Sequence, residues 1–194
     1  MRSELIRFDT VFFELINTRF GNDLLDGPMR FVSDEKFWIV CSLLFLIYAF
    51  VSKSIIFKRY CAVMAIAVFV SDMVSFRVLK PWFERQRPCY QLENVRLVSD
   101  SCGSQYGFPS NHAANGFAIA TSLHVFTRKR WALGFYLLAI FVGFTRVYLG
   151  VHFPFDVLFG FSVGLVSGFM AVKVFNSLGP VYGKAKKIVL KLAT

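Results

Sequence analysis

The sequence has few acidic residues, with 12 Asp and Glu against 22 Lys and Arg, and its formal net charge is +10. Such a charge is one mark of nucleic-acid binding, but the chain lacks the basic stripe with interleaved stacking aromatic residues that those proteins use. It also lacks internal repeats, low-complexity tracts and linkers. These absences argue against a nucleic-acid partner and favour one domain whose basic residues meet anionic lipid.

Hydrophobic residues make up 56% of the 194-residue chain and aromatic residues 18%, and the mean hydropathy is +0.54. These values exceed those of ordinary soluble domains. The composition therefore predicts an integral membrane protein. We divide it into an N-terminal segment (1–36), a transmembrane core (37–177) and a basic cytoplasmic tail (178–194).

Five hydrophobic runs predict an all-α bundle of about five transmembrane helices. The first, 37–57, has 21 residues with one charge, and at ~1.5 Å per residue it matches a hydrocarbon core ~30 Å thick. The other expected spans are 60–79, 113–126, 131–149 and 154–175. Tryptophans favour the ends of spans, and all three fall there: Trp38, Trp82 and Trp131.

Residues 1–36 are expected to contribute one amphipathic helix that lies in the membrane interface. Its apolar positions recur at helical spacing and are interrupted by charges at Arg7, Asp9, Glu14 and Arg19. A cleavable signal is disfavoured because no uncharged core follows the basic start. Turns are then predicted at Gly21, Gly27 and Pro28.

The distribution of charge predicts which face of the membrane each connection occupies. The short corners 52–59 and 127–130 and the C-terminal tail are basic and contain no acid, so the positive-inside rule places them in the cytoplasm. The 80–112 loop then faces the periplasm of a bacterial inner membrane. Cys89 and Cys102 lie in that loop and form a candidate disulfide in an oxidising compartment. Cys41 and Cys61 are interpreted as core residues.

The residues that could take part in a reaction lie in three separated stretches: KPWFERQRP (80–88), GFPSNHAAN (107–115) and TRVYLGVHFPFD (145–156). Pro154 predicts a helix start that places Asp156 near His152, where its carboxylate can accept a proton from the imidazole and fix the tautomer. The span count puts all three stretches on one membrane face. We therefore expect their cations, histidines and helix N-terminus to surround one phosphoryl group.

Simpler interpretations exist for individual residues. Lys80 can be a snorkelling lysine and Arg87 a solvated arginine, and Ser110 and Asn111 can be plain helix caps. An intramembrane carboxylate is functional by default, but Asp72 is more simply a supporting residue that buttresses Lys80 or meets Asn115.

The motifs KPWFERQRP, PSNH and RVYLGVHFPFD together resemble the three signature motifs of the type 2 phosphatidic acid phosphatase family, lipid phosphatases that share a core with vanadium haloperoxidases. The resemblance covers roughly residues 72–160. Asn111 stands where the family usually has glycine, and Thr145 where serine is common. Neither departure removes a catalytic side chain.

The resemblance implies a role for each site residue. His152 is the nucleophile, Asp156 orients it, and His112 protonates the leaving oxygen and later activates water. Lys80, Arg87, Arg146, Ser110 and Asn111 bind the phosphate. No metal and no cofactor are required.

The resemblance leaves the substrate open. Undecaprenyl diphosphate is the first choice, and phosphatidylglycerol phosphate, phosphatidic acid and lipid A 1-phosphate are alternatives. Phosphate transfer to a second lipid and non-catalytic lipid binding or transport are competing functions, and the sequence does not reveal the oligomeric state.

Overall fold

The computed structural model describes the backbone of residues 2–192 and the side chains of residues 4–178. The described chain is helical and contains no strand, apart from an isolated β-bridge between Gln86 and Tyr106. The α-helices in chain order are α1 (Arg2–Glu14), α2 (Asp23–Ser33), α3 (Glu35–Val51), α4 (Ile55–Asp72), α5 (Lys80–Phe83), α6 (Pro88–Gln91), α7 (Asn111–Thr127), α8 (Leu133–Tyr148) and α9 (Pro154–Leu192). Three short helical segments join them: η1 (Leu15–Arg19), η2 (Met73–Leu79) and η3 (Arg130–Ala132).

The predicted all-α membrane bundle is confirmed. Three described segments are long and apolar enough to cross a bilayer: Ile55–Phe83, Arg130–Tyr148 and Pro154–Leu178. The other two predicted spans coincide with α3 and α7, which have 17 residues each and therefore reach ~25 Å at ~1.5 Å per residue. The count of five crossings stays a prediction.

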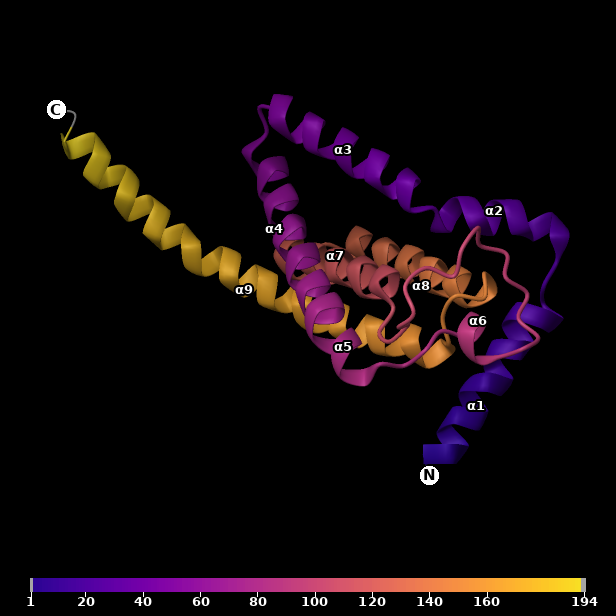
Figure 1. The fold of residues 1–194 in the computed structure, drawn as a ribbon. Coiled ribbons are helices and arrows are strands. Elements are labelled where there is room, and N and C mark those ends of the chain that lie inside the picture. Colours follow the sequence, from indigo (N-terminus) through magenta and orange to yellow (C-terminus); the bar gives the residue numbers. More distant parts are fainter. Residues whose placement is uncertain (1, 193–194) are drawn as a thin grey trace.

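Helix α7 lies at the centre of the bundle and packs against α4, α8 and α9 (Figure 1). Glycines of α9 face small residues of α7 along this seam. A Cβ atom on Gly168 would lie only 2.6 Å from the carbonyl oxygen of Ala118. The two backbones therefore touch over successive turns, as in other membrane helix pairs with small residues at the interface.

Helix α3 stands apart from the bundle along most of its length (Figure 1). Its apolar side chains are exposed on nearly every face, as expected of a surface that meets lipid. The predicted end of this span at residue 57 is wrong, because a sharp turn already begins at Ser52. The hydroxyl of Ser52 accepts the Ser54 N–H, and Ser54 caps α4 by accepting the Phe57 N–H.

The N-terminal segment contains two helices instead of the single one expected. Gly21 lies in the break between them, but Gly27 and Pro28 lie inside α2, so the predicted turn there is wrong. Tertiary contacts offset the unfavourable proline. The side chain of Asn22 caps α2, and the carboxylate of Asp26 accepts hydrogen bonds from Arg96 and from the Tyr148 hydroxyl.

Helix α9 begins at Pro154, as predicted, and continues to Leu192. The basic side chains of the predicted cytoplasmic tail (178–194) lie outside the residues whose side chains are described. On the opposite side of the bundle, the loop from α6 to α7 carries a disulfide between Cys89 and Cys102, with 6.3 Å between their Cα atoms. This loop, the start of α7 and the start of α9 meet at one end of the bundle.

Candidate active site

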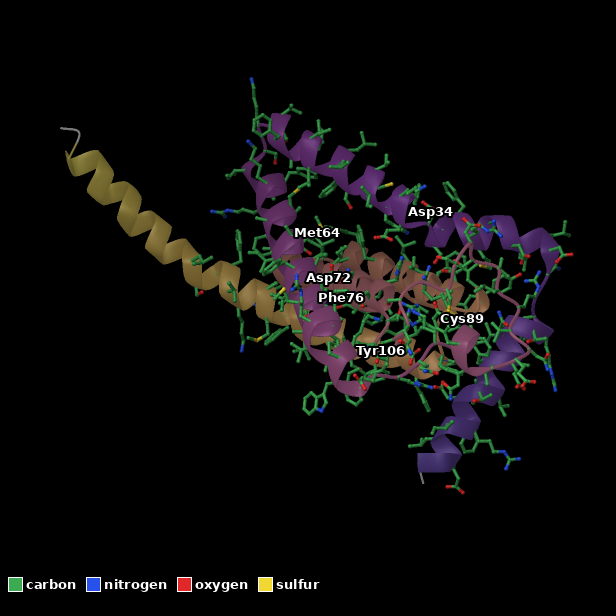
Figure 2. All side chains as sticks on the ribbon, viewed as in Figure 1. Asp34, Met64, Asp72, Phe76, Cys89 and Tyr106 are labelled. Carbon is green, nitrogen blue, oxygen red and sulfur yellow. A yellow bond between two sulfur atoms is a disulfide. The ribbon has the colours of Figure 1, made fainter. Side chains whose placement is uncertain are left out.

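A cavity of about 410 Å³ opens at that end of the bundle. Figure 2 labels Asp34 at the start of α3 and Phe76 on η2, two of its lining residues that are far apart in the sequence. Six of the predicted site residues line it: Lys80, Arg87, Asn111, His112, Arg146 and His152. The three stretches singled out in the sequence therefore converge on one space.

The loop backbone holds Lys80 and Arg87 in place on one side of the cavity. The ammonium of Lys80 donates to the carbonyl oxygens of Tyr106 (3.2 Å) and Pro109 (3.0 Å). The Nε of Arg87 donates to the carbonyl oxygen of Ser104 at 2.6 Å, and its Nη1 donates to that of Val151 at 3.0 Å. Both cations are buried, so their direction is fixed before any anion binds.

Arg146 reaches the cavity from the end of α8 and is held by α2. Its Nη1 donates to the Ser33 hydroxyl at 2.5 Å and to the Ser33 carbonyl oxygen at 3.3 Å. The Nε of Arg146 is buried and has no hydrogen-bond partner in the structure. A buried charged donor without a partner favours an anionic ligand at this position.

His152 lies between the cations and α9 with 2% of its surface exposed. Its Nε2 is 3.0 Å from Arg87 Nη1. An arginine has only donors, so Nε2 accepts this bond through its lone pair and the ring proton sits on Nδ1. Burial is the main cause of a lowered pKa for His152, and the positive charges of Arg87, Arg146 and Lys80 add to it. The ring is therefore neutral and presents a lone pair to the cavity.

Asp156 lies behind His152, on the side away from the cavity. Its Oδ2 is 3.5 Å from His152 Nδ1 and accepts the backbone N–H of Phe153 at 2.9 Å. Its Oδ1 accepts from Arg85 Nη1 at 2.8 Å. The carboxylate thus faces the protonated nitrogen of His152, although the 3.5 Å separation is longer than a hydrogen bond.

The start of α7 supplies His112 and Asn111 to the cavity, and Ser110 precedes them at the N-terminal end of the helix. Ser110 is the N-cap residue of α7, yet its buried hydroxyl makes no cap bond and has no partner in the structure. Its backbone N–H donates to the Asp156 carbonyl oxygen at 2.9 Å. Ser110 is not among the described residues that line the cavity, and its predicted role in phosphate binding stays a prediction; its backbone N–H links the start of α7 to the start of α9.

The supporting pair predicted within the membrane forms a contact. Asp72 Oδ1 accepts from Asn115 Nδ2 at 3.0 Å and from Asn111 Nδ2 at 3.1 Å. Asn111 is thus shared between this contact and the cavity wall. A carboxylate that accepts two amide donors restrains the side-chain position of Asn111 at the cavity edge.

Sequence reasoning missed three residues at or behind the site: Ser33, Arg85 and Asp9. Arg85 lies two positions before Arg87 in the KPWFERQRP motif, so its charge was a usable signal. Ser33 and Asp9 carried none, because they come from the N-terminal segment and meet the site only in the folded chain. Among the described residues, no group of three or more His, Cys, Asp and Glu side chains is placed to hold a metal ion.

The fold and this site define a helical membrane protein with a cavity at one end of the bundle, lined by cationic side chains and two histidines. Residues 56–179 match the model of the PAP2 superfamily, and the chain belongs to that family. The helices that can cross a bilayer make it a multi-pass membrane protein.

Curated relatives of this chain are named for several different lipid phosphatase activities. A lipid A 4′-phosphatase of Porphyromonas gingivalis is 30% identical over 157 residues, which are 78% of this chain and 66% of that relative. An undecaprenyl-diphosphatase of Sulfolobus acidocaldarius is 32% identical over 182 residues, 91% of this chain and 82% of that relative. The chain spans 52% and 60% of the length of two further curated relatives. It therefore covers between about half and two thirds of the length of the first relatives that it matches.

A solved structure is also similar. The transmembrane PAP2 type phosphatidylglycerolphosphate phosphatase of Bacillus subtilis superposes with a TM-score of 0.66 at 27% identity. The match covers 90% of this chain and 87% of that one.

Proposed function

We propose that this protein is a metal-independent lipid phosphatase that works through a phosphohistidine on His152. The observation that carries the proposal is the His152 ring, whose Nε2 lone pair points to Arg87 and the cavity while its Nδ1 faces Asp156. A phosphoryl group that enters the cavity displaces Nε2 from Arg87 and takes the guanidinium as its own partner. The nucleophilic Nε2 then faces the phosphorus atom, while the guanidinium of Arg87 neutralises charge on the phosphate oxygens.

The reaction has two steps. The Nε2 lone pair of His152 attacks phosphorus, the bond from phosphorus to the leaving oxygen breaks, and protonated His112 donates its proton to that oxygen. In the free protein, burial and the charges of Arg146, Arg87 and Lys80 lower the pKa of His112 to about 3, so His112 takes up this proton when the anionic substrate has offset those charges. Lys80, Arg87 and Arg146 neutralise the remaining phosphate oxygens, and Asp156 stabilises the positive ring. Water then attacks the phosphohistidine while His112 takes its proton, the P–N bond breaks, and inorganic phosphate leaves.

The site lies on the periplasmic face of a bacterial inner membrane in this proposal. Two features support that side. The corners at the other end of the bundle are short and basic, and the site loop contains the Cys89–Cys102 disulfide, which fits an oxidising compartment. A lipid headgroup at that level places its phosphate in the cavity and its tail beside the apolar helices.

We rank undecaprenyl diphosphate first among the candidate substrates, because the undecaprenyl-diphosphatase relative aligns over 91% of this chain. Arg30, which also lines the cavity, is placed to meet a second phosphate. The second candidate is a lipid A phosphomonoester, favoured by the lipid A 4′-phosphatase relative.

The test is phosphate release by the purified protein in detergent with a chelator present. The panel contains undecaprenyl diphosphate, lipid A phosphates, phosphatidylglycerol phosphate and phosphatidic acid. We expect release from at least one lipid, with loss of activity in His152→Ala and full activity in His124→Ala, which changes the one histidine outside the site. No release from any lipid, or equal activity in His152→Ala, rejects the proposal.

A further inference from the structure

The N-terminal helix α1 contains a buried carboxylate that the proposed reaction does not use. Its apolar side chains, including Ile6, Phe8 and Phe12, are about half exposed, as expected of a helix in the membrane interface. Asp9, on the same helix, is 1% exposed. A carboxylate is rarely buried without partners, so its contacts indicate what it does.

Both oxygens of Asp9 have partners near the active site. Oδ1 accepts the backbone N–H of Phe155 at 2.9 Å, in the first turn of α9. Oδ2 accepts from Arg85 Nη2 in a short charge-assisted hydrogen bond. Asp9 therefore fastens the helix turn that carries Asp156 and the arginine that binds Asp156.

Arg85 joins two buried carboxylates. Its Nη2 binds Asp9, and its Nη1 binds Asp156 Oδ1 at 2.8 Å. Its guanidinium also lies 4.4 Å from the centroid of the Phe153 ring, and that ring packs against Phe13 of the N-terminal helix. These contacts allow the guanidinium little freedom to turn.

The chain of contacts ends at the nucleophile. Asp156 Oδ1 is held by Arg85, and this leaves Oδ2 directed at the backbone N–H of Phe153 and at His152 Nδ1. If Arg85 loses Asp9, it keeps one carboxylate partner and can rotate with it. The direction of Oδ2, and with it the tautomer and angle of the His152 ring, is then no longer fixed.

We propose that Asp9 and Arg85 are positioning residues that set the direction of Asp156 toward His152, so that the interfacial helix α1 is part of the active site. This inference rests on the proposed phosphatase function. It assigns α1 a role in the rate of the chemical step, beyond attachment to the membrane.

The experiment compares Asp9→Asn with wild type in the full-length protein, after hydrolysis by wild type and its loss in His152→Ala have been established. We expect kcat to fall on the order of 10- to 100-fold, as for other partners that orient a catalytic group. We expect KM and the inhibition constant of inorganic phosphate, the reaction product, to stay within about twofold, because Lys80, Arg87 and Arg146 are untouched. Asp9→Glu, which keeps the charge, should recover part of kcat.

Asp26→Asn is the matched control. Asp26 belongs to another arginine–aspartate network, which is partly exposed and in which Arg96 ties α2 to the loop without a bond to Asp156. We expect it to lower the melting temperature while kcat stays within about twofold of wild type. The inference is overturned if Asp9→Asn keeps wild-type kcat, if its inhibition by inorganic phosphate weakens in parallel with the fall in kcat, or if Asp26→Asn loses kcat equally. Inactive wild-type protein would instead reject the phosphatase function itself.

Discussion

Arg87 Nη1 lies 3.0 Å from His152 Nε2, so a permanently charged donor occupies the position that phosphorus takes in the proposed reaction. The arrangement keeps the nucleophilic nitrogen unprotonated in the resting protein, since a second proton on the ring would point at a guanidinium. It also means that the substrate replaces one hydrogen bond of Arg87 with stronger ones to phosphate.

The first prediction concerns the charge of His152. Its pKa in the folded protein lies well below the ordinary 6.5, so the folded ring stays neutral as pH falls through 6.5 while an unfolded chain takes up the proton. The stability due to the neutral ring is present above pH 6.5 and is lost as pH falls below it. Histidine-labelled protein has only three imidazole signals to assign by NMR. In Arg87→Gln the pH midpoint of the His152 titration should move upward, toward 6.5, because one of the nearby positive charges is removed. An unchanged midpoint would contradict the role of Arg87 in lowering the pKa of His152.

A second prediction separates the roles of the two site histidines. His112→Ala should slow hydrolysis of the intermediate, because no base then activates water, while an aryl phosphate with a good leaving group can still phosphorylate His152. Quenching in alkali, where a phosphohistidine is stable, after exposure to aryl phosphate labelled on phosphorus should therefore trap label in His112→Ala that later acid treatment releases. Label that persists in the double variant with His152→Ala would show that another residue is phosphorylated.

The third prediction addresses Ser33, the residue of α2 that holds Arg146. A hydrogen bond to a charged group contributes about 1.5–3 kcal/mol, so Ser33→Ala should raise KM for the lipid about tenfold with kcat nearly unchanged. Ser177→Ala removes a comparable hydroxyl in α9 far along the chain from the cavity and serves as the control. Steady-state kinetics in mixed micelles measures both; equal KM values in the two variants would exclude the role of Ser33.

The fourth prediction concerns the Cys89–Cys102 disulfide, which closes a loop of 13 residues in sequence separation. Such a loop contributes on the order of 3 kcal/mol of stability. The loop between the cysteines and α7 also supplies the Ser104 oxygen to Arg87. Cys89→Ser with Cys102→Ser should lower the melting temperature and reduce phosphate binding, and wild type treated with a reductant should match it. The control is Cys41→Ser, which changes a free cysteine on α3.

The sequence predicted the helices of the bundle wherever a long apolar run ends in a charged or tryptophan-bearing corner. The sequence-based prediction failed where short polar contacts determine where a helix begins, continues or ends. The α2 helix runs through Gly27 and Pro28 because Asn22, Asp26 and Tyr148 hold it from outside, and no local pattern reports those bonds. The end of α3 was readable from Ser52 and Ser54, but a hydropathy window averages over them.

The candidate site was accessible from sequence in its cavity-facing part. Lys80, Arg87, His112, Arg146 and His152 were found because charged side chains are costly in a membrane chain and topology put them on one face. The residues behind them were not. Asp9 meets Arg85 across 76 positions, and Ser33 meets Arg146 across 113, and one sequence contains no signal for pairs that distant.

The glycine seam between α7 and α9 bears on which lipid headgroups the cavity can accept. One helix carries His112 and the other begins two residues after His152, and the two backbones approach closely at the glycines of α9. In the proposed reaction, this packing fixes the separation between the proton donor His112 and the nucleophile His152. Differences between lipid headgroups would then be accommodated at the opposite wall of the cavity, which Ser33 and Asp34 form at the α2–α3 junction.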